Sequence, residues 1–289
     1  MSVTVIYNPK SGTTGGLDDI KKAFAAQDIQ PTYLPVTSKL LHRQLKTELT
    51  NPRAIIVAAG GDGTVSTVAS FVHGSKAKLG IIPSGTLNHF AKDAGIPLGI
   101  EEAVKLVAHG SAKKVDAAMV NKKIFVNNAS IGLYPLSLRT RAQYDGQIGK
   151  WPAALVGAIK VLAHPRRYHV ELAIDGKKIV RRTPFVFIGN NSYHFNQPPF
   201  LRRPKLDTGL LSVTVVKAHS PLAVIHLFIK TLFTKKRRTA EFETYNVASF
   251  RLYTRHHRSL HVAYDGEVTT LKTPLVYTSL PGALRVIMP

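Results

Sequence analysis

The first 117 residues alternate short β-branched runs with helical patterns, and this alternation restricts the fold more than any other feature of the sequence. The predicted strands are residues 3–7, 32–36, 54–58 and 79–82. The predicted helices are residues 17–27, 39–49, 65–72, 86–93 and 101–109. Gly110 is the predicted C-terminal cap of the last helix. This alternation is typical of a parallel sheet covered by helices, which binds ligands at the carboxyl ends of its strands.

After about residue 113 the sequence becomes rich in strand patterns. The predicted strands are residues 115–120, 124–128, 168–174, 179–188, 210–217, 242–253 and 260–264. Residues 148–163 and 221–233 are the two stretches here with helical patterns. The sequence therefore predicts an α/β domain over residues 1–117 and a β-rich domain over residues 118–289, whose last residues are able to pack back on the first domain.

Basic residues are concentrated in the second predicted domain. The chain carries 39 Lys and Arg against 17 Asp and Glu, a formal net charge of +22. Residues 118–289 hold 26 of the basic and 8 of the acidic side chains, a net of +18. A field of this size attracts polyanions such as nucleic acid, anionic lipid headgroups or a phosphorylated substrate. The alternative is a solubilising surface, but solubility does not require such asymmetry.

A glycine-rich loop, Gly-Gly-Asp-Gly-Thr at residues 60–64, follows the third predicted strand and precedes a helical pattern. Glycines let backbone N–H groups approach a phosphate, and the N-terminus of the helix favours negative charge. The Asp62 carboxylate would repel phosphates unless a divalent cation lies between them, or unless it handles a proton. The loop therefore indicates Mg²⁺–nucleotide chemistry, with a plain glycine-rich turn as the alternative. It is not a Walker A loop, because no Gly-Lys-Ser/Thr follows, and it is not a Rossmann fingerprint, because Ser66 stands at the third glycine position.

Two further loops lie at predicted strand-to-helix turns of the same sheet. Asn8-Pro9-Lys10-Ser11-Gly12 follows the first strand, and Pro-Ser-Gly-Thr-Leu-Asn at residues 83–88 follows the fourth. Their hydroxyl, amide and backbone groups suit contacts to phosphate or ribose. Either loop alone is an ordinary α/β connection, but three such loops at one sheet edge favour a nucleotide site.

These three loops, followed by Phe90-Ala91 and by Asp265-Gly266-Glu267, resemble the diacylglycerol kinase catalytic family, which includes bacterial lipid kinases and sphingosine kinases. The motifs span nearly the whole chain. The resemblance implies a nucleotide-binding α/β domain with a parallel sheet, a C-terminal β-sandwich-like domain, and an active site in the cleft between them. It also implies ATP-dependent phosphorylation of the hydroxyl group of a lipid, such as diacylglycerol or a related lipid alcohol, with ATP and Mg²⁺ as cofactors.

The same resemblance implies the roles of individual residues. Asp62 and Glu267 would serve catalysis, and Asp62 would also hold the metal through Mg–ATP. The residues implied to contact ATP are Asn8, Pro9, Lys10, Ser11, Gly12, Thr37, Gly60, Gly61, Asp62, Gly63, Thr64, Val65, Ser66 and Thr86.

Glu267 follows Asp265-Gly266, which by itself indicates a hairpin turn. Asp175-Gly176 also follows a predicted strand, and Lys177 stands there in the position of Glu267. A carboxylate beside an alcohol can accept its proton as the oxygen attacks a γ-phosphate. The sequence leaves open whether Asp62 or Glu267 takes that proton.

Three positions depart from the family pattern. Family members often have two adjacent aspartates that help to hold a structural Mg²⁺, but Thr208 stands at the second position here, which puts that metal in question. His89 replaces the acidic residue that commonly follows the asparagine of the third loop. Residues 193–195 lack the glycines that many relatives have, which predicts a reshaped substrate cleft.

Two apolar stretches of the second domain suggest a membrane. Residues 221–233 run into Lys235-Lys236-Arg237-Arg238, a composition typical of a segment lying on an anionic membrane. A core helix that ends in a solvated basic turn is the alternative, and residues 148–163 allow the same two interpretations. The cluster His256, His257 and His261 lacks nearby Asp, Glu or Cys ligands and is interpreted as strand-surface histidines.

The chain has no cysteine, which excludes disulfides, thiolate zinc sites and cysteine nucleophiles. It shows neither a signal-peptide pattern nor an uninterrupted apolar run of about 18 residues. We therefore expect a cytoplasmic protein that associates peripherally with the inner face of the membrane. The expected partners are the lipid substrate and an anionic membrane surface. No nucleic-acid partner is expected, because no nucleic-acid-binding module is present, and a homodimer remains open.

Three functions follow, of which an ATP-dependent lipid kinase is favoured. A kinase of a soluble substrate is the second, because NAD kinases and phosphofructokinases have a similar Gly-Gly-Asp-Gly loop. Residues 83–88 and 265–267 match lipid kinases better. A non-catalytic membrane- or nucleotide-binding protein of the same fold is the third, and the presence of both Asp62 and Glu267 argues against it. The identity of the lipid is not encoded in these motifs.

Overall fold

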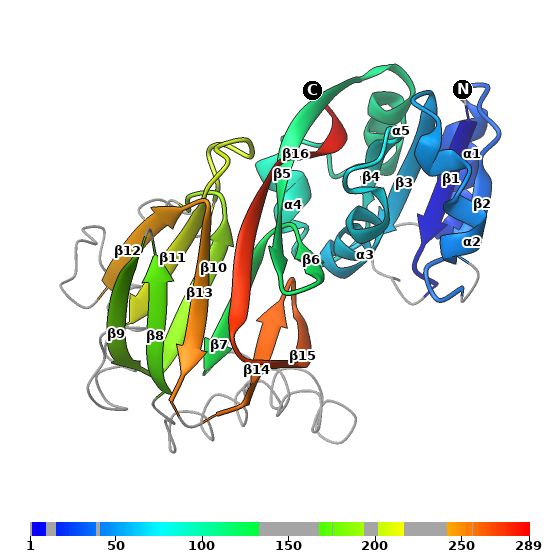
Figure 1. The fold of residues 1–289 in the computed structure, drawn as a ribbon. Coiled ribbons are helices and arrows are strands. Elements are labelled where there is room, and N and C mark those ends of the chain that lie inside the picture. Colours follow the sequence, from blue (N-terminus) through cyan, green and yellow to red (C-terminus); the bar gives the residue numbers. More distant parts are fainter. Residues whose placement is uncertain are drawn as a thin grey trace, which may run out of the picture.

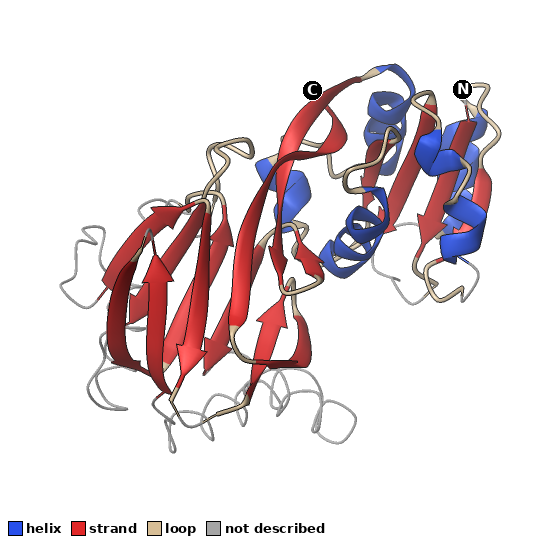
Figure 2. Cartoon of the chain, in the orientation of Figure 1, coloured by secondary structure: helices blue, strands red, loops and turns tan. Residues whose placement is uncertain are grey.

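A computed structural model describes residues 2–9, 16–38, 41–132, 168–174, 176–193, 202–216, 242–255 and 257–289. The helical patterns at residues 148–163 and 221–233 and the basic run at 235–238 lie outside these residues. Figure 1 shows two parts side by side, and Figure 2 shows most of the described helices around the part that contains the N-terminus, with α4 at the junction beside β5 and β16.

The N-terminal part is built on a parallel sheet in the order β2-β1-β3-β4. Its strands are β1 (Ser2–Tyr7), β2 (Thr32–Pro35), β3 (Ala54–Gly60) and β4 (Lys78–Pro83). The helices are α1 (Leu17–Ala25), α2 (Leu41–Leu45), α3 (Asp62–Val72), α4 (His89–Asp93) and α5 (Ile100–His109), with a short 3₁₀ helix, η1 (Glu48–Thr50). The predicted parallel α/β arrangement is confirmed.

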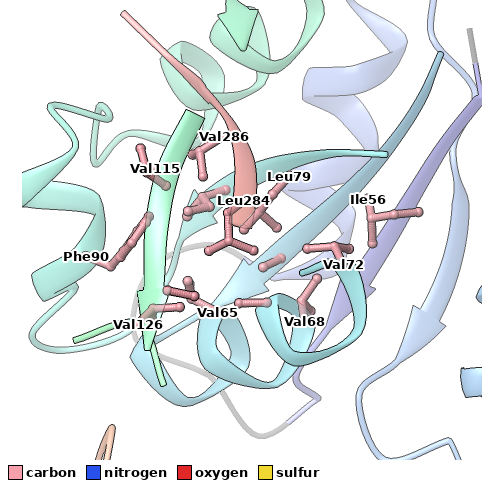
Figure 3. Close-up of a cluster of buried hydrophobic side chains, with 14 of the residues drawn as sticks. Ile56, Val65, Val68, Val72, Leu79, Phe90, Val115, Val126, Leu284 and Val286 are labelled. Atoms are coloured by element: carbon pink, nitrogen blue, oxygen red, sulfur yellow. The ribbon is translucent and has the colours of Figure 1, made fainter. Parts of the chain in front are cut away.

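Strand β3 lies at the centre of this part and is buried on both faces, as expected for an apolar run in a parallel sheet covered by helices. On one face Ile56 packs in a core with Val65 and Val68 of α3 (Figure 3). On the other face Val57 packs in a core with Phe24 of α1. These contacts place the carboxyl end of β3, and the glycine loop after it, at the base of α3.

Helix α3 begins at Asp62, so Asp62, Gly63 and Thr64 form its first turn and not a loop before it. The predicted helix 39–49 is interrupted into α2 and η1, and the predicted helix 86–93 contracts to α4. Gly110 is the C-terminal cap residue of α5, but with an extended backbone and not the left-handed one usual for a cap glycine.

The C-terminal part consists of two sheets of mainly antiparallel strands, which confirms the sandwich-like prediction. One is a six-stranded sheet in the order β12-β11-β10-β7-β14-β15. The other is an extension of the parallel sheet through β16, β13, β8 and β9, in which β5 pairs with β16 and β6 pairs with β5. The strands are β5 (Ser111–Val120), β6 (Lys123–Phe125), β7 (Asn128–Gly132), β8 (Tyr168–Ile174), β9 (Lys177–Thr183), β10 (Phe185–Asn190), β11 (Leu211–Val216), β12 (Phe242–Val247), β13 (Ser249–Thr254), β14 (Ser259–Tyr264), β15 (Glu267–Lys272) and β16 (Leu275–Met288).

Three of the predicted strands are each divided into two strands in the structure. At each division the chain crosses from one sheet to the other. Residues 124–128 divide into β6 and β7, residues 179–188 into β9 and β10, and residues 242–253 into β12 and β13. The apolar pattern continues through these crossings because both sheets contribute to one core. Arg181 of β9 and Glu243 of β12 form an ion pair at 2.7 Å that joins the two sheets.

The last strand, β16, was not predicted, and it joins the two parts. It pairs in parallel with β4 at Val286 and antiparallel with β5 and β13. Its pattern is interrupted at Pro281-Gly282, where the register with β5 shifts and Gly282 has a positive φ of 59°. Leu284 is fully buried in the same core as Ile56 (Figure 3). The edge strand β15 was also missed, since its sequence Glu-Val-Thr-Thr-Leu-Lys is mostly polar.

Because Leu284 links the C-terminal strand to the core of the N-terminal part, we expect Leu284→Ala to lower the free energy of unfolding by about 2–5 kcal/mol. The matched control is Leu98→Ala, whose side chain is 48% exposed and whose loss should cost less than about 0.5 kcal/mol. Urea unfolding curves measure both. Equal midpoints for the two variants would show that β16 does not support this core.

Candidate active site

The loops after β1, β3 and β4 lie together at the carboxyl ends of these strands. The Asn8 N–H donates to the carbonyl of Ala59 at 3.2 Å, and the Ser84 N–H donates to the carbonyl of Gly60 at 3.0 Å. A Cβ atom on Gly85 would lie 2.4 Å from the Cα of Gly61, so this approach requires glycine. Of the predicted first loop, Asn8 and Pro9 are described, and Lys10, Ser11 and Gly12 lie outside the described residues.

Asp62 of the glycine loop caps the helix that follows the third loop. Its Oδ2 accepts the N–H of His89 and its Oδ1 accepts the N–H of Phe90, each at 3.1 Å. The cap residue of α4, Asn88, has a left-handed backbone, and its side-chain amide bonds back to Gly85. Asp62 therefore satisfies the N–H groups that Asn88 leaves open, and it holds the two loops together.

Asn127 is a buried residue at the site that the sequence analysis missed. Its Nδ2 donates to Oδ1 of Asp62 at 3.4 Å, and its Oδ1 accepts a hydrogen bond from Nη2 of Arg203 at 2.7 Å. A guanidinium group only donates, so it fixes which end of the amide faces Asp62. The Tyr193 hydroxyl donates to the carbonyl of Asn127 at 2.9 Å. Burial raises the pKa of Tyr193 to about 12, so this hydroxyl stays a donor at neutral pH.

Arg203 is fully buried and was also missed. Its Nε pairs with the Asp93 carboxylate at 2.8 Å, at the last residue of α4. The guanidinium carbon lies 5.6 Å from the ring centres of both Phe90 and Tyr193. A buried charge is tolerated only when it is paired and hydrogen-bonded, and these contacts meet that requirement. Arg203 thus holds α4 at its C-terminal end directly and at its N-terminal end through Asn127 and Asp62.

Asp265 connects the Asp-Gly-Glu motif to the same junction. Its carboxylate accepts backbone N–H bonds from Val126, Asn127 and Asn128, at 2.7, 2.8 and 3.1 Å. Burial raises the pKa of Asp265 above its ordinary value, although these N–H groups and the Ser66 side chain favour its charged form. Asp265 and Gly266 therefore form a two-residue hairpin turn, with φ of 44° and 87°. The Asp265 carboxylate also binds the backbone where the chain crosses from β6 to β7.

Glu267 is the first residue of β15, immediately after this hairpin turn. Its side chain is exposed, and its Oε2 accepts the Tyr264 hydroxyl at 3.3 Å. Burial, followed by the charge of Glu267, raises the pKa of Tyr264 above its ordinary value, so the tyrosine acts as the donor. The hairpin of β8 and β9 has the same two-residue connection, with Lys177 at the equivalent position.

Some of the other residues predicted to contact ATP are exposed, and some are buried. Thr37, Gly63 and Thr86 are exposed at the ends of β2, α3 and β4. Val65 is buried in the core shown in Figure 3, and Ser66 is buried against Asp265. Only backbone groups of these two residues are therefore in a position to serve a nucleotide.

The stretch around Thr208, where the family resemblance implied a structural metal, is held by hydrogen bonds within the chain. The Thr208 hydroxyl and N–H both donate to Oδ1 of Asn191, at 2.6 and 2.8 Å. The Asp116 carboxylate accepts the N–H groups of Gly209 and Gly282. Asp207 is exposed, and the described residues contain no group of three or more His, Cys, Asp or Glu arranged to hold a metal ion. These residues do not fit that structural metal.

The remaining sequence predictions bear on the surface. His261 Nδ1 lies 2.9 Å from the Thr270 hydroxyl, His257 packs near the ring of Tyr168, and His256 lies outside the described residues. Within the ranges that the structure covers, no helix is long and apolar enough to cross a membrane.

Two family models match this chain. The diacylglycerol kinase catalytic domain matches residues 2–120, and the YegS C-terminal NAD kinase beta sandwich-like domain matches residues 142–288. Diacylglycerol kinases from Staphylococcus aureus strains MRSA252 and JH9 are each 25% identical over 299 residues, which cover 99% of this chain and 91% of each relative. A crystal structure of a diacylglycerol kinase from Bacillus anthracis strain Sterne has a TM-score of 0.74 and 26% identity, and it covers 100% of this chain and 97% of its own.

Removing the Arg203 charge should leave Asp93 buried without its partner. We expect Arg203→Met to lower the free energy of unfolding by about 3–5 kcal/mol. Adding Asp93→Leu should recover part of the loss, because no unpaired charge then remains. The control is Arg202→Met at the exposed neighbouring position. Urea unfolding of the four proteins tests this, and an Arg203 variant as stable as the Arg202 variant would contradict the assigned role.

Proposed function

We propose, because this chain belongs to the diacylglycerol kinase catalytic family, that it transfers the γ-phosphate of ATP to the hydroxyl group of a lipid such as diacylglycerol or a related lipid alcohol. Both family models together extend over most of the chain. The observation that carries the proposal is the junction at residues 126–128. The Asn127 side chain contacts Asp62. The backbone N–H groups of residues 126–128 bind Asp265, in the hairpin turn that precedes Glu267.

The two carboxylates differ in their hydrogen bonds, and this difference supports different roles. Oδ1 of Asp62 accepts two N–H groups and Oδ2 accepts one, so Oδ2 keeps a lone pair for a cation. A carboxylate held in this way suits Mg²⁺, which usually binds one or two protein carboxylates together with substrate phosphates. When bound, Mg²⁺ would neutralise charge on the transferred phosphoryl group.

Glu267 suits the role of general base. Its carboxylate is exposed and accepts a hydrogen bond from the Tyr264 hydroxyl. In the proposed reaction, Glu267 accepts the proton of the lipid hydroxyl as that oxygen attacks the γ-phosphorus and the bond to ADP breaks. We therefore assign the proton to Glu267 and the metal to Asp62.

The nucleotide phosphates are proposed to lie against the glycine loop. Gly60 and Gly61 place backbone at the start of α3, whose N-terminal N–H groups favour an anion. The exposed Thr86 after β4 and Asn8 after β1 border the same edge of the sheet. This arrangement leaves ATP on the N-terminal part and the acceptor hydroxyl on the side of Glu267.

A soluble acceptor is the second candidate, because the second family model is described as NAD kinase-like and such enzymes share the glycine loop. The names of the relatives and the basic C-terminal part favour a lipid. We expect labelled ATP with Mg²⁺ to phosphorylate a lipid alcohol in a panel that also contains NAD. Label in NAD alone would support the second candidate, and label in neither would support a non-catalytic protein.

Conservative variants of Asp62 and Glu267 should distinguish the roles of the two carboxylates. Glu267→Gln should reduce turnover on the order of 10²-fold or more and leave Mg–ATP affinity unchanged, because the base acts on the acceptor. Asp62→Asn should reduce turnover by a similar factor and also weaken Mg²⁺-dependent ATP binding. Glu101→Gln, at an exposed position of α5, is the charge-matched control. Single-turnover rates and ATP titrations measure both effects, and loss of ATP binding in the Glu267→Gln variant would make Glu267 a nucleotide contact.

A further inference from the structure

The outer surface of β9, β8 and β13 carries a regular array of basic side chains. These three strands are neighbours in the large sheet and lie side by side in Figures 1 and 2. Their register places outward-facing residues in three rows, which we call the basic face. The rows are Arg182, His169 and Arg255, then Val180, Glu171 and Tyr253, then Lys178, Ala173 and Arg251.

The alternation of burial along the strands shows that this array faces solvent. Val170, Leu172 and Leu252 are fully buried between the two sheets, so the residues on either side of them point outward. Val180 is 59% exposed. The three strands enclose a shallow hollow of about 690 Å³ on this side. The basic face is therefore an open surface and not part of the sandwich core.

Four basic side chains occupy the corners of the array, namely Arg182, Arg255, Lys178 and Arg251. From the usual spacing of strands and residues, they span about 10 by 13 Å. Glu171 is the one carboxylate in the three rows, and it pairs with Lys178 at 3.2 Å. The face therefore keeps a net positive charge of several units.

Protection of a sheet edge does not explain this charge. Charged residues on an edge strand prevent pairing with other chains, and β9 is an edge strand. Arg251, however, belongs to β13 and Arg255 follows directly after it, and β13 lies between β16 and β8 and presents no free edge. Solubility does not explain it either, because solubility is served by interspersed charges of both signs.

We propose that the basic face docks the protein on an anionic phospholipid bilayer. The corners supply charge complementary to anionic headgroups. The middle row supplies Val180 and Tyr253, an apolar and an aromatic side chain of the kind that enters the interfacial region. This inference deepens the proposed function, on which it rests, by naming the surface that brings a lipid kinase to its substrate.

The test compares two pairs of arginines that differ in position alone. Arg251→Gln with Arg255→Gln removes two charges of the face, one from the interior strand β13 and one from the residue directly after it. Arg43→Gln with Arg53→Gln removes the same two charges from exposed positions of the N-terminal part. Cosedimentation is measured with phosphatidylcholine vesicles, with and without phosphatidylglycerol, over a salt series. Urea unfolding midpoints establish that each variant is folded.

We expect R251Q/R255Q to weaken partition to phosphatidylglycerol vesicles roughly 25-fold at low salt, at about fivefold for each basic residue. R43Q/R53Q should bind as the unchanged protein does. Binding should weaken with salt, because exposed charges are screened beyond about 8 Å at physiological ionic strength. Equal losses in the two pairs, or equal binding to neutral vesicles, would overturn the proposal. Loss of RNA binding with unchanged vesicle binding in R251Q/R255Q would overturn it as well.

A second assay separates this proposal from the proposed function. Phosphorylation of a short-chain diacylglycerol dispersed in water does not require a bilayer, so R251Q/R255Q should retain it. A protein that binds vesicles through the basic face but phosphorylates no lipid alcohol would refute the proposed function and leave the docking surface standing. Phosphorylation of the dispersed lipid, with vesicle binding unaffected by R251Q/R255Q, would refute the docking surface alone.

Discussion

The buried guanidinium of Arg203 is the interaction on which the candidate site depends. A cation removed from water requires partners on every side, and here these are a carboxylate, two aromatic rings, an amide and backbone carbonyls. Each partner is thereby fixed in position. Asp93 fixes one end of α4, and Asn127 transmits the constraint to Asp62 at the other end. The geometry of the glycine loop is thus set by a residue more than a hundred positions away in the chain.

The crossing from β6 to β7 concentrates these contacts in three consecutive residues. Val126, Asn127 and Asn128 offer their N–H groups to Asp265, while the Asn127 side chain bridges Arg203 and Asp62. The chain changes sheet at this point, so its backbone groups are not used in a single ladder and remain open to side chains. The crossing between the sheets therefore supplies the hydrogen-bond donors that connect Asp62 with the hairpin turn before Glu267.

Much of this arrangement could be predicted from local sequence, and the remainder depends on contacts distant in sequence. The parallel sheet, the glycine loop and the Asp-Gly turn follow from short patterns whose backbone requirements are local. Asn127 and Arg203 are single polar residues without a surrounding motif, so nothing in the sequence marks them as buried. The divided strands retained one continuous apolar pattern, because both sheets face one core. Strand β16 escaped prediction because Pro281-Gly282 interrupts its pattern where the strand is bulged.

The position of β16 has a consequence for how the protein folds during its synthesis on the ribosome. Strand β4 receives its outer neighbour only from the last residues of the chain, at Val286. Until β16 has been synthesised, β4 is therefore an uncovered edge, and Leu79 and Ile81 lack the cover of Leu284 and Val286. Domains usually fold from the N-terminus as they emerge, but the core of this N-terminal part is completed only when β16 has been synthesised and reaches β4.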